Sequence, residues 1–247
     1  MWTVADLQLD SRLVLGTGCS PHLEHLEEAL SGTEAGLTIV PIRAAVAPLD
    51  FASFAARVKE CGSLVVPSTA GCMTPEDAID TADLATERLG TRWLLLDLTA
   101  CQRTRRPCVE GTLEAARALV GRGWTVLARC SDDPVICQRL ADIGCAAVVP
   151  AAPVQQSVDL RRLAALRSCT SAALVVDLGQ VSTADALSAV EVGADAVLVG
   201  LNSFNGRQIS AFGHALRLAT RAGEIALASG SADRQESGSR SQAKPQG

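Results

Sequence analysis

Two acidic side chains lie at the ends of apolar segments. Asp97 follows Trp93–Leu96, and Asp177 follows Ala173–Val176. Two carboxyl groups in one concave site can serve as proton donor and proton acceptor when their surroundings separate their pKa values. The pair therefore predicts an acid–base site. The alternative is that each carboxylate caps a helix or pairs with an arginine.

Glycines lie at or just after the ends of the last two apolar segments of the chain. Gly179 comes shortly after Asp177, and Gly200 ends the next apolar segment, just before Asn202 and Ser203. In α/β barrels the last two loops often hold phosphate through backbone N–H groups and a helix N-terminus. We therefore predict that Gly179, Gly200, Asn202 and Ser203 bind phosphate. Glycines that only permit tight turns would give the same pattern.

The chain has nine cysteines, and no two of them form a C-x-x-C pair. Structural zinc sites usually contain such closely spaced pairs. We predict no metal site and no cofactor, and we expect most thiols to be buried or incidental. Cys72 differs from the other cysteines because it lies in the loop after the apolar segment Ser63–Val66. It is therefore a candidate catalytic residue.

Apolar segments of strand length alternate with longer amphipathic segments throughout the chain. Two of the longer segments begin with helix-start signals, Thr74-Pro75-Glu76-Asp77 and Ser182-Thr183-Ala184-Asp185. Eight strands that alternate with helices predict a parallel sheet closed into a (β/α)₈ TIM barrel of the α/β class. The expected strands are Arg12–Leu15, Leu37–Ile42, Ser63–Val66, Trp93–Leu98, Thr125–Ala128, Ala146–Val149, Ala173–Asp177 and Ala196–Gly200.

Composition narrows the class of protein. Hydrophobic residues make up 48% of the 247 residues but aromatic ones only 3%, so the core must be aliphatic. The net charge of −5 and the lack of a basic stripe argue against nucleic-acid binding.

We see neither a membrane-spanning segment nor a signal peptide, and we expect a soluble cytoplasmic protein. We predict one barrel domain over residues 1–228 and a disordered polar tail over 229–247.

Several motifs stand out along the chain: Ser11-Arg12-Leu13 through Gly16-Thr17-Gly18, Thr69-Ala70-Gly71-Cys72, Cys130-Ser131-Asp132-Asp133-Pro134-Val135, Gly144-Cys145-Ala146-Ala147-Val148 and Gly193-Ala194-Asp195. Together they resemble those of the bacterial thiazole synthase family, which builds the thiazole ring of thiamine. The resemblance runs from Leu7 to Gly230. It implies a barrel in which a lysine forms an imine with a deoxyxylulose phosphate, and a ubiquitin-like carrier protein that delivers sulfur.

This chain departs from that pattern at the residue that matters most. The resemblance places the family's lysine at Leu95, and it places a glutamate of the family at Asp97. The chain has only two lysines, Lys59 in a segment expected on the outside of the barrel and Lys244 in the tail. The loop sequences Ala151–Ser157 and Gly179–Val181 also lack glycines that the family has. Leucine cannot form an imine.

Three hypotheses follow. The first is an accessory or non-catalytic subunit that works with a lysine-bearing paralogue or a ubiquitin-like sulfur-carrier protein, in a homo- or hetero-oligomer. The second is a diverged sulfur-transfer or sugar-phosphate enzyme that works without an imine, through Asp97, Asp177 and Cys72. The third is a small-molecule binding protein that uses the barrel mouth as a receptor.

Overall fold

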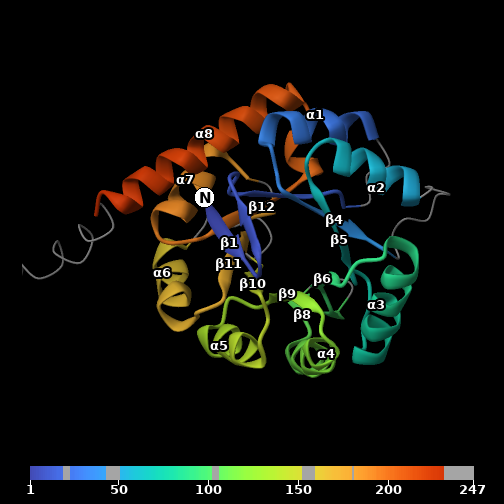
Figure 1. The fold of residues 1–247 in the computed structure, drawn as a ribbon. Helices are drawn as coiled ribbons and strands as arrows, with labels where there is room; N and C mark the ends of the chain where they lie inside the picture. Colours follow the sequence, from blue (N-terminus) through green and yellow to red (C-terminus); the bar gives the residue numbers. More distant parts are fainter. Residues whose placement is uncertain (19–22, 43–50, 102–105, 152–158, 180, 231–247) are drawn as a thin grey trace, which may run out of the picture.

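Eight parallel strands close into a barrel, as the alternation of segments predicts (Figure 1). The computed structural model describes residues 1–18, 23–42, 51–101, 106–151, 159–179 and 181–230. Around the barrel each strand is a neighbour of the one before it, and the last pairs with the first. The barrel strands are β3 (Leu13–Gly16), β4 (Leu37–Pro41), β5 (Leu64–Ser68), β6 (Trp93–Leu96), β9 (Thr125–Cys130), β10 (Ala147–Pro150), β11 (Ala173–Asp177) and β12 (Ala196–Gly200).

Helices surround the barrel, and each barrel strand is followed by one of them (Figure 1). Because the helices cover the outer face of every strand, the strands are buried on both faces, which explains their near-continuous apolar sequences. The helices are α1 (Leu23–Thr33), α2 (Phe51–Glu60), α3 (Pro75–Leu89), α4 (Val109–Gly121), α5 (Pro134–Ile143), α6 (Leu160–Cys169), α7 (Thr183–Glu191) and α8 (Ile209–Ala228).

The two predicted helix starts are confirmed. Thr74 caps α3, because its side chain accepts a hydrogen bond of 3.2 Å from the backbone N–H of Asp77, and Pro75 is the first residue of the helix. Ser182 and Asp185 form a reciprocal capping box at the start of α7. Such caps satisfy backbone N–H groups that have no partner within the helix, so they fix where each helix begins.

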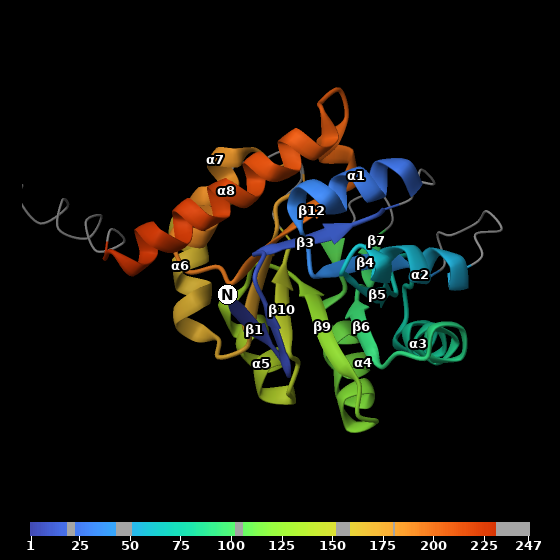
Figure 2. The same cartoon turned by 45° about the horizontal axis from the view of Figure 1, so that its top comes forward.

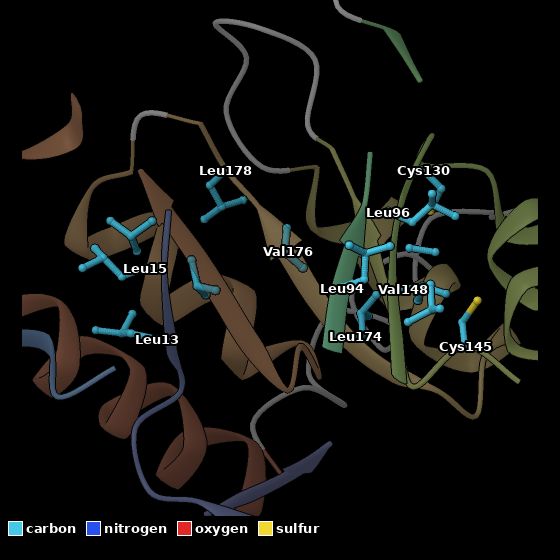
Figure 3. Close-up of a cluster of buried hydrophobic side chains, with 14 of the residues drawn as sticks. Leu13, Leu15, Leu94, Leu96, Cys130, Cys145, Val148, Leu174, Val176 and Leu178 are labelled. Carbon is cyan, nitrogen blue, oxygen red and sulfur yellow. The ribbon is translucent and has the colours of Figure 1, made fainter. Parts of the chain in front are cut away.

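Side chains alternate along each strand between the barrel interior and the layer under the helices. On β6, Leu94 and Leu96 belong to the outer layer, whereas Leu95 belongs to the interior. Figure 3 shows outer-layer side chains such as Leu13, Leu15, Leu94 and Leu96. The alternation follows from the two-residue period of a strand, and it decides which residues can reach the mouth.

A hairpin that the sequence analysis does not predict lies at the amino end of the barrel. It consists of β1 (Trp2–Val4) and β2 (Leu7–Leu9), which pair in antiparallel fashion. Trp2 and Val4 are buried against the interior side chains, and Trp2 Nε1 donates to the Ser11 carbonyl oxygen at 2.8 Å. A second unpredicted pair, β7 (Thr99–Cys101) with β8 (Arg106–Pro107), lies between β6 and α4.

Helix α8 lies across both α1 and α7 (Figure 2). Glycines permit these crossings: a Cβ added at Gly32 would lie 2.2 Å from the Ser210 carbonyl oxygen, and one at Gly223 would lie 2.4 Å from the Leu187 carbonyl oxygen. Helix α8 ends at Ala228. Residues 231–247 of the predicted tail lie outside the described residues. No helix in the described part of the chain has the length and apolar character needed to span a bilayer.

Candidate functional site

The carboxyl end of the barrel brings three charged side chains together. Asp97 directly follows β6, Arg129 is the fifth residue of β9, and Asp177 ends β11. Each is two residues beyond an interior side chain of its own strand, namely Leu95, Leu127 and Val175, respectively. The two-residue period therefore points all three side chains into the mouth of the barrel, where active sites of this fold lie.

Arg129 joins the two acids. Its Nε donates to Asp177 Oδ2 at 3.1 Å, and its Nη1 lies 3.4 Å from Asp97 Oδ1. The three side chains are 15% to 20% exposed, so they are mostly screened from water but still open to the mouth. A planar guanidinium with several N–H donors suits this bridging position between two carboxylates.

The pKa of Arg129 is raised above its ordinary value. Burial acts to lower it, but the negative charges of Asp97 and Asp177 outweigh burial, and hydrogen bonds to both acids add to their effect. Arg129 therefore stays protonated at any pH at which the protein is folded. The mouth contains a permanent positive charge, and it comes from β9.

Neighbouring loops hold the two acids in place. The backbone N–H of Asp97 donates to Thr69 Oγ1 at 2.8 Å, and that hydroxyl lies 3.0 Å from the Asp97 carbonyl oxygen. Gly179 donates its backbone N–H to Asp177 Oδ1 at 3.1 Å. Because these contacts come from the loops after β5 and β11, the positions of the carboxylates depend on the closed barrel.

Leu95 occupies the interior directly below these charges. It pairs in register with Leu127 of β9, two residues before Arg129, and it is only 4% exposed. Lys59 is exposed on α2, on the outside of the barrel, as expected. Lys244 lies outside the described residues. Within the described residues no amine reaches the mouth.

Two of the predicted phosphate-binding residues, Gly179 and Ser203, are hydrogen-bonded to each other. The Ser203 hydroxyl donates to the Gly179 carbonyl oxygen at 3.2 Å and accepts from the backbone N–H of Val181 at 3.4 Å. The N–H of Gly179 is bonded to Asp177. Gly200 ends β12, and Asn202 is exposed in a short 3₁₀ turn (Leu201–Phe204). Several donors that a phosphate would need are thus already used.

Cys72 lies under helix α3 and does not face the mouth. Its side chain is fully buried, with Sγ 3.4 Å from the Asp77 carbonyl oxygen and 3.3 Å from Thr81 Oγ1. The other cysteines in the described part are free thiols, and burial raises the pKa of Cys145 to about 12. No group of three or more potential metal ligands occurs within the described ranges.

Arg129 is not among the site residues predicted from the sequence. The apolar segment Thr125–Ala128 predicts a strand that ends before Arg129, whereas β9 continues to Cys130. The signal was present in the sequence, because Leu127 and Arg129 are two residues apart and must share one face of a strand. An arginine on the interior face of a barrel strand needs a charged partner.

Comparison with known proteins gives consistent matches over nearly the whole chain. The family described as thiazole biosynthesis protein ThiG matches residues 3–243. A thiazole synthase of Sorangium cellulosum is 36% identical over 233 residues, which cover 92% of this chain and 90% of that protein. A thiazole synthase of Yersinia enterocolitica is 36% identical over 239 residues, which cover 95% of this chain and 91% of that protein.

Solved structures agree on the fold. The crystal structure of the Amycolatopsis orientalis BexX/CysO complex matches with a TM-score of 0.80 at 24% identity, over 93% of this chain and 96% of that chain. A native KDPGal structure matches with a TM-score of 0.61 at 17% identity, over 89% of this chain and 98% of that one. At these identities the structural matches establish the barrel alone.

Proposed function

Since the chain belongs to the thiazole biosynthesis protein ThiG family, we propose that it is an accessory barrel of sulfur-incorporating biosynthesis, of the thiamine-thiazole or thiosugar type. In this role it does not form the family's imine itself. The observation that carries the proposal is Leu95, an apolar interior side chain at the position to which the family resemblance assigns the lysine. An imine needs an amine nucleophile, and a leucine has none.

The pairing of Arg129 supports this proposal. A general acid or base must be able to exchange a proton with the substrate. The guanidinium instead occupies one oxygen of Asp177 and lies beside one oxygen of Asp97. This arrangement resembles a structural ion group more than a pair of carboxyl groups poised for proton transfer.

The loops that were predicted to bind phosphate also support the accessory role. A sugar phosphate bound near α7 would have to displace the bonds that Gly179 and Ser203 make within the chain. It would also lie close to the carboxylates of Asp177 and of Asp185, which caps α7. Like charges at a helix N-terminus weaken the attraction that this position offers to an anion.

The proposed partner is a ubiquitin-like sulfur-carrier protein or a lysine-bearing paralogue. The family resemblance implies the carrier. BexX, the barrel that matches with a TM-score of 0.80, was solved in a complex with CysO. The shared fold over 93% of this chain is compatible with docking of such a protein, even though the mouth has no amine at position 95.

Imine trapping tests the missing chemistry. The purified chain is incubated with 1-deoxyxylulose 5-phosphate and sodium borohydride, which reduces an imine to a stable amine, and the intact mass is measured. We expect no adduct on the native chain. Leu95→Lys is the matched variant, because it restores an amine at the interior position without any other change. An adduct on the native chain contradicts the proposal.

Affinity purification followed by native mass spectrometry tests the partner. Recovery of the chain with a carrier protein or with a lysine-bearing barrel supports the accessory role. A monodisperse homo-oligomer that binds neither of them, when each is added in purified form, contradicts it.

A diverged enzyme remains the second candidate, because the mouth does bring Asp97 and Asp177 to one guanidinium. This candidate predicts that Asp177→Asn abolishes a turnover that the native chain shows. Unchanged turnover in that variant would remove Asp177 from the mechanism.

A further inference from the structure

Three buried cysteines gather where helix α5 packs on the barrel. Cys130 ends β9, Cys137 lies in the first turns of α5, and Cys145 lies between α5 and β10. Their exposed fractions are 2%, 0% and 5%, and all three belong to the apolar layer between the strands and the helices. Figure 3 shows Cys130 and Cys145 in this layer. The period of the strand places Cys130 on the face of β9 opposite to Arg129, so its thiol is separate from the charged group at the mouth.

Two of the three thiols are in contact. The Sγ atoms of Cys130 and Cys137 are 3.6 Å apart, and Cys137 Sγ also lies 3.8 Å from the carbonyl oxygen of Ser131. Both cysteines are free thiols in the structure. The sulfur atoms of a disulfide are about 2.05 Å apart, so the two thiols would have to approach by about 1.5 Å. Rotations of the two side chains about their Cα–Cβ bonds move the sulfur atoms over distances of this size.

The start of α5 holds the two cysteines together. Only three residues separate the end of β9 from Pro134, the first residue of α5. The Asp133 carboxylate caps the helix by accepting a hydrogen bond of 2.8 Å from the backbone N–H of Val135. The N–H of Cys137 donates to the Asp133 carbonyl oxygen at 3.0 Å. The first turn of the helix therefore lies against the end of the strand.

Apolar packing alone does not account for the pair. A buried cysteine often acts only as a small apolar side chain. Cys145 fits that description, because burial is what raises its pKa to about 12. The pKa of Cys130 is also raised well above its ordinary value, but first by the hydrogen bond with Cys137 and then by burial. The contact between the two thiols is thus distinct from ordinary burial.

We propose that Cys130 and Cys137 are an oxidation site, at which a small hydroperoxide converts the two thiols into an intrachain disulfide. The bond joins the end of β9 to the first turns of α5. Because Arg129 directly precedes Cys130, the bond also restrains the strand end that carries the guanidinium of the mouth. A small oxidant suits this site, since thiols that are 2% and 0% exposed do not admit a bulky one such as glutathione disulfide.

Hydrogen peroxide supplies the two oxidising equivalents that the bond requires. The thiolate of one cysteine attacks a peroxide oxygen and the O–O bond breaks, which gives a sulfenic acid and a hydroxide ion. The hydroxide takes up the proton that the thiol released and becomes water. The other thiol then attacks the sulfenic sulfur, the S–O bond breaks, and a second water leaves. Two thiols and one peroxide thus give one disulfide and two waters, with sulfur oxidised and oxygen reduced.

Burial slows the first of these steps, whereas the thiol contact favours the second. A buried, protonated thiol seldom presents the thiolate that reacts with peroxide, so the first step depends on local opening at the start of α5. Once the helix has closed again, the second sulfur lies beside the sulfenic acid, as it lies 3.6 Å from the thiol in the reduced chain. We therefore expect slow formation of the disulfide without accumulation of the sulfinic acid.

Peptide mapping tests the site directly, because trypsin cleaves after Arg129 and Arg139 and leaves both cysteines in one peptide. The folded full-length chain is treated with hydrogen peroxide, and catalase then removes the excess. Free thiols are blocked with N-ethylmaleimide in denaturant at mildly acidic pH before digestion. We expect the peptide of residues 130–139 to lose two hydrogens and to take up no N-ethylmaleimide. Dithiothreitol added before the blocking step should restore both thiols.

Cys137→Ala is the decisive variant, and Cys145→Ala is its matched control. Without the thiol at position 137, Cys130 should take up N-ethylmaleimide, and the fraction of residue 130 found in a disulfide should fall by roughly tenfold or more. In Cys145→Ala the peptide of residues 130–139 should still lose two hydrogens. Circular dichroism confirms that each variant is folded before its peptides are compared.

Hydrogen exchange tests the restraint on the strand that carries Arg129. Backbone amides from residue 129 to residue 137 should exchange more slowly in the oxidised chain than in the reduced one, because the bond limits local opening. Cys137→Ala treated with the same peroxide controls for oxidation elsewhere, for example at the exposed Cys61. Equal exchange in the oxidised and reduced native chains contradicts the restraint.

Three results would overturn the oxidation site. The first is a native peptide that keeps both free thiols after the exposed Cys61 has been oxidised. The second is a disulfide that joins residue 130 to Cys145 instead, and the third is a disulfide that forms only in the chain unfolded by urea. Oxidation by glutathione disulfide but not by hydrogen peroxide overturns the choice of oxidant. The inference is independent of the proposed accessory function, because imine trapping reports on the mouth and not on these thiols.

Discussion

The two ends of the barrel are closed by different chemistry. At the amino end Trp2 and Val4 of the hairpin pack on the apolar interior, whereas at the carboxyl end Arg129 lies between Asp97 and Asp177. Apolar packing stabilises the fold in proportion to the area removed from water. Mostly buried ion groups return little net stability after the cost of desolvation. The hairpin at the amino end should therefore contribute more to the stability of the fold than the charged group at the carboxyl end.

Removing the apolar closure should have the largest effect. Trp2 is 4% exposed and also donates a hydrogen bond to Ser11, so Trp2→Ala loses both contacts. We expect the free energy of unfolding to fall by about 4 kcal/mol, as for other buried large-to-small substitutions. Urea denaturation monitored by circular dichroism measures it. A loss below about 1 kcal/mol would show that the hairpin is not part of the cooperative fold.

Arg129→Leu should have the next largest effect. The change removes the cation between two mostly buried carboxylates, which costs about 3 kcal/mol at neutral pH. Urea denaturation at neutral pH, monitored by circular dichroism, measures this loss. A loss below about 1 kcal/mol contradicts the ion-group interpretation.

A double-mutant cycle links the missing lysine to Arg129. Leu95→Lys alone places a second cation in the interior below the guanidinium, and it should destabilise the fold. In Leu95→Lys with Arg129→Leu the new amine can take the place of the guanidinium beside the acids. We expect a favourable coupling of about 2 kcal/mol between the two substitutions. Additive effects would mean that residue 95 does not reach the acids.

The smallest loss of stability is expected from a substitution of Glu224, which lies on helix α8. Burial acts to raise its pKa, but hydrogen bonds from Arg12 and Arg221 hold the pKa at about 2. A glutamate in the unfolded chain has a pKa near 4.3, so the lower pKa of Glu224 stabilises the folded state above about pH 5. This stabilisation is lost as the pH falls toward about 2. Glu224→Gln should lose about 1 kcal/mol at neutral pH and weaken this acid dependence.

The control for that last prediction is Asp83→Asn, which removes an exposed ion pair with Arg122. We expect almost no change in the free energy of unfolding, because exposed pairs contribute little. Equal losses in the two variants would argue that the contacts of Glu224 are no stronger than those of an ordinary surface pair.

Much of the site could be predicted from local patterns. The two-residue period of a strand places Leu95 inside and Asp177 at the mouth, and both positions agree with the structure. Arg129 was missed because its strand is longer than its apolar segment. The hairpin of β1 and β2 was missed because its two strands have only three residues each, too few for a clear pattern.

The sequence by itself determined the barrel, the family and the absence of a lysine at position 95, because these depend on residue identity and on local periodicity. Tertiary structure alone decided that Arg129 meets Asp97 and Asp177, which are 32 and 48 residues away along the chain. It also decided that Cys72 faces α3 and that Ser203 bonds to Gly179. The physical reason is that such contacts exist only once the sheet has closed, and no local pattern specifies which side chains then meet.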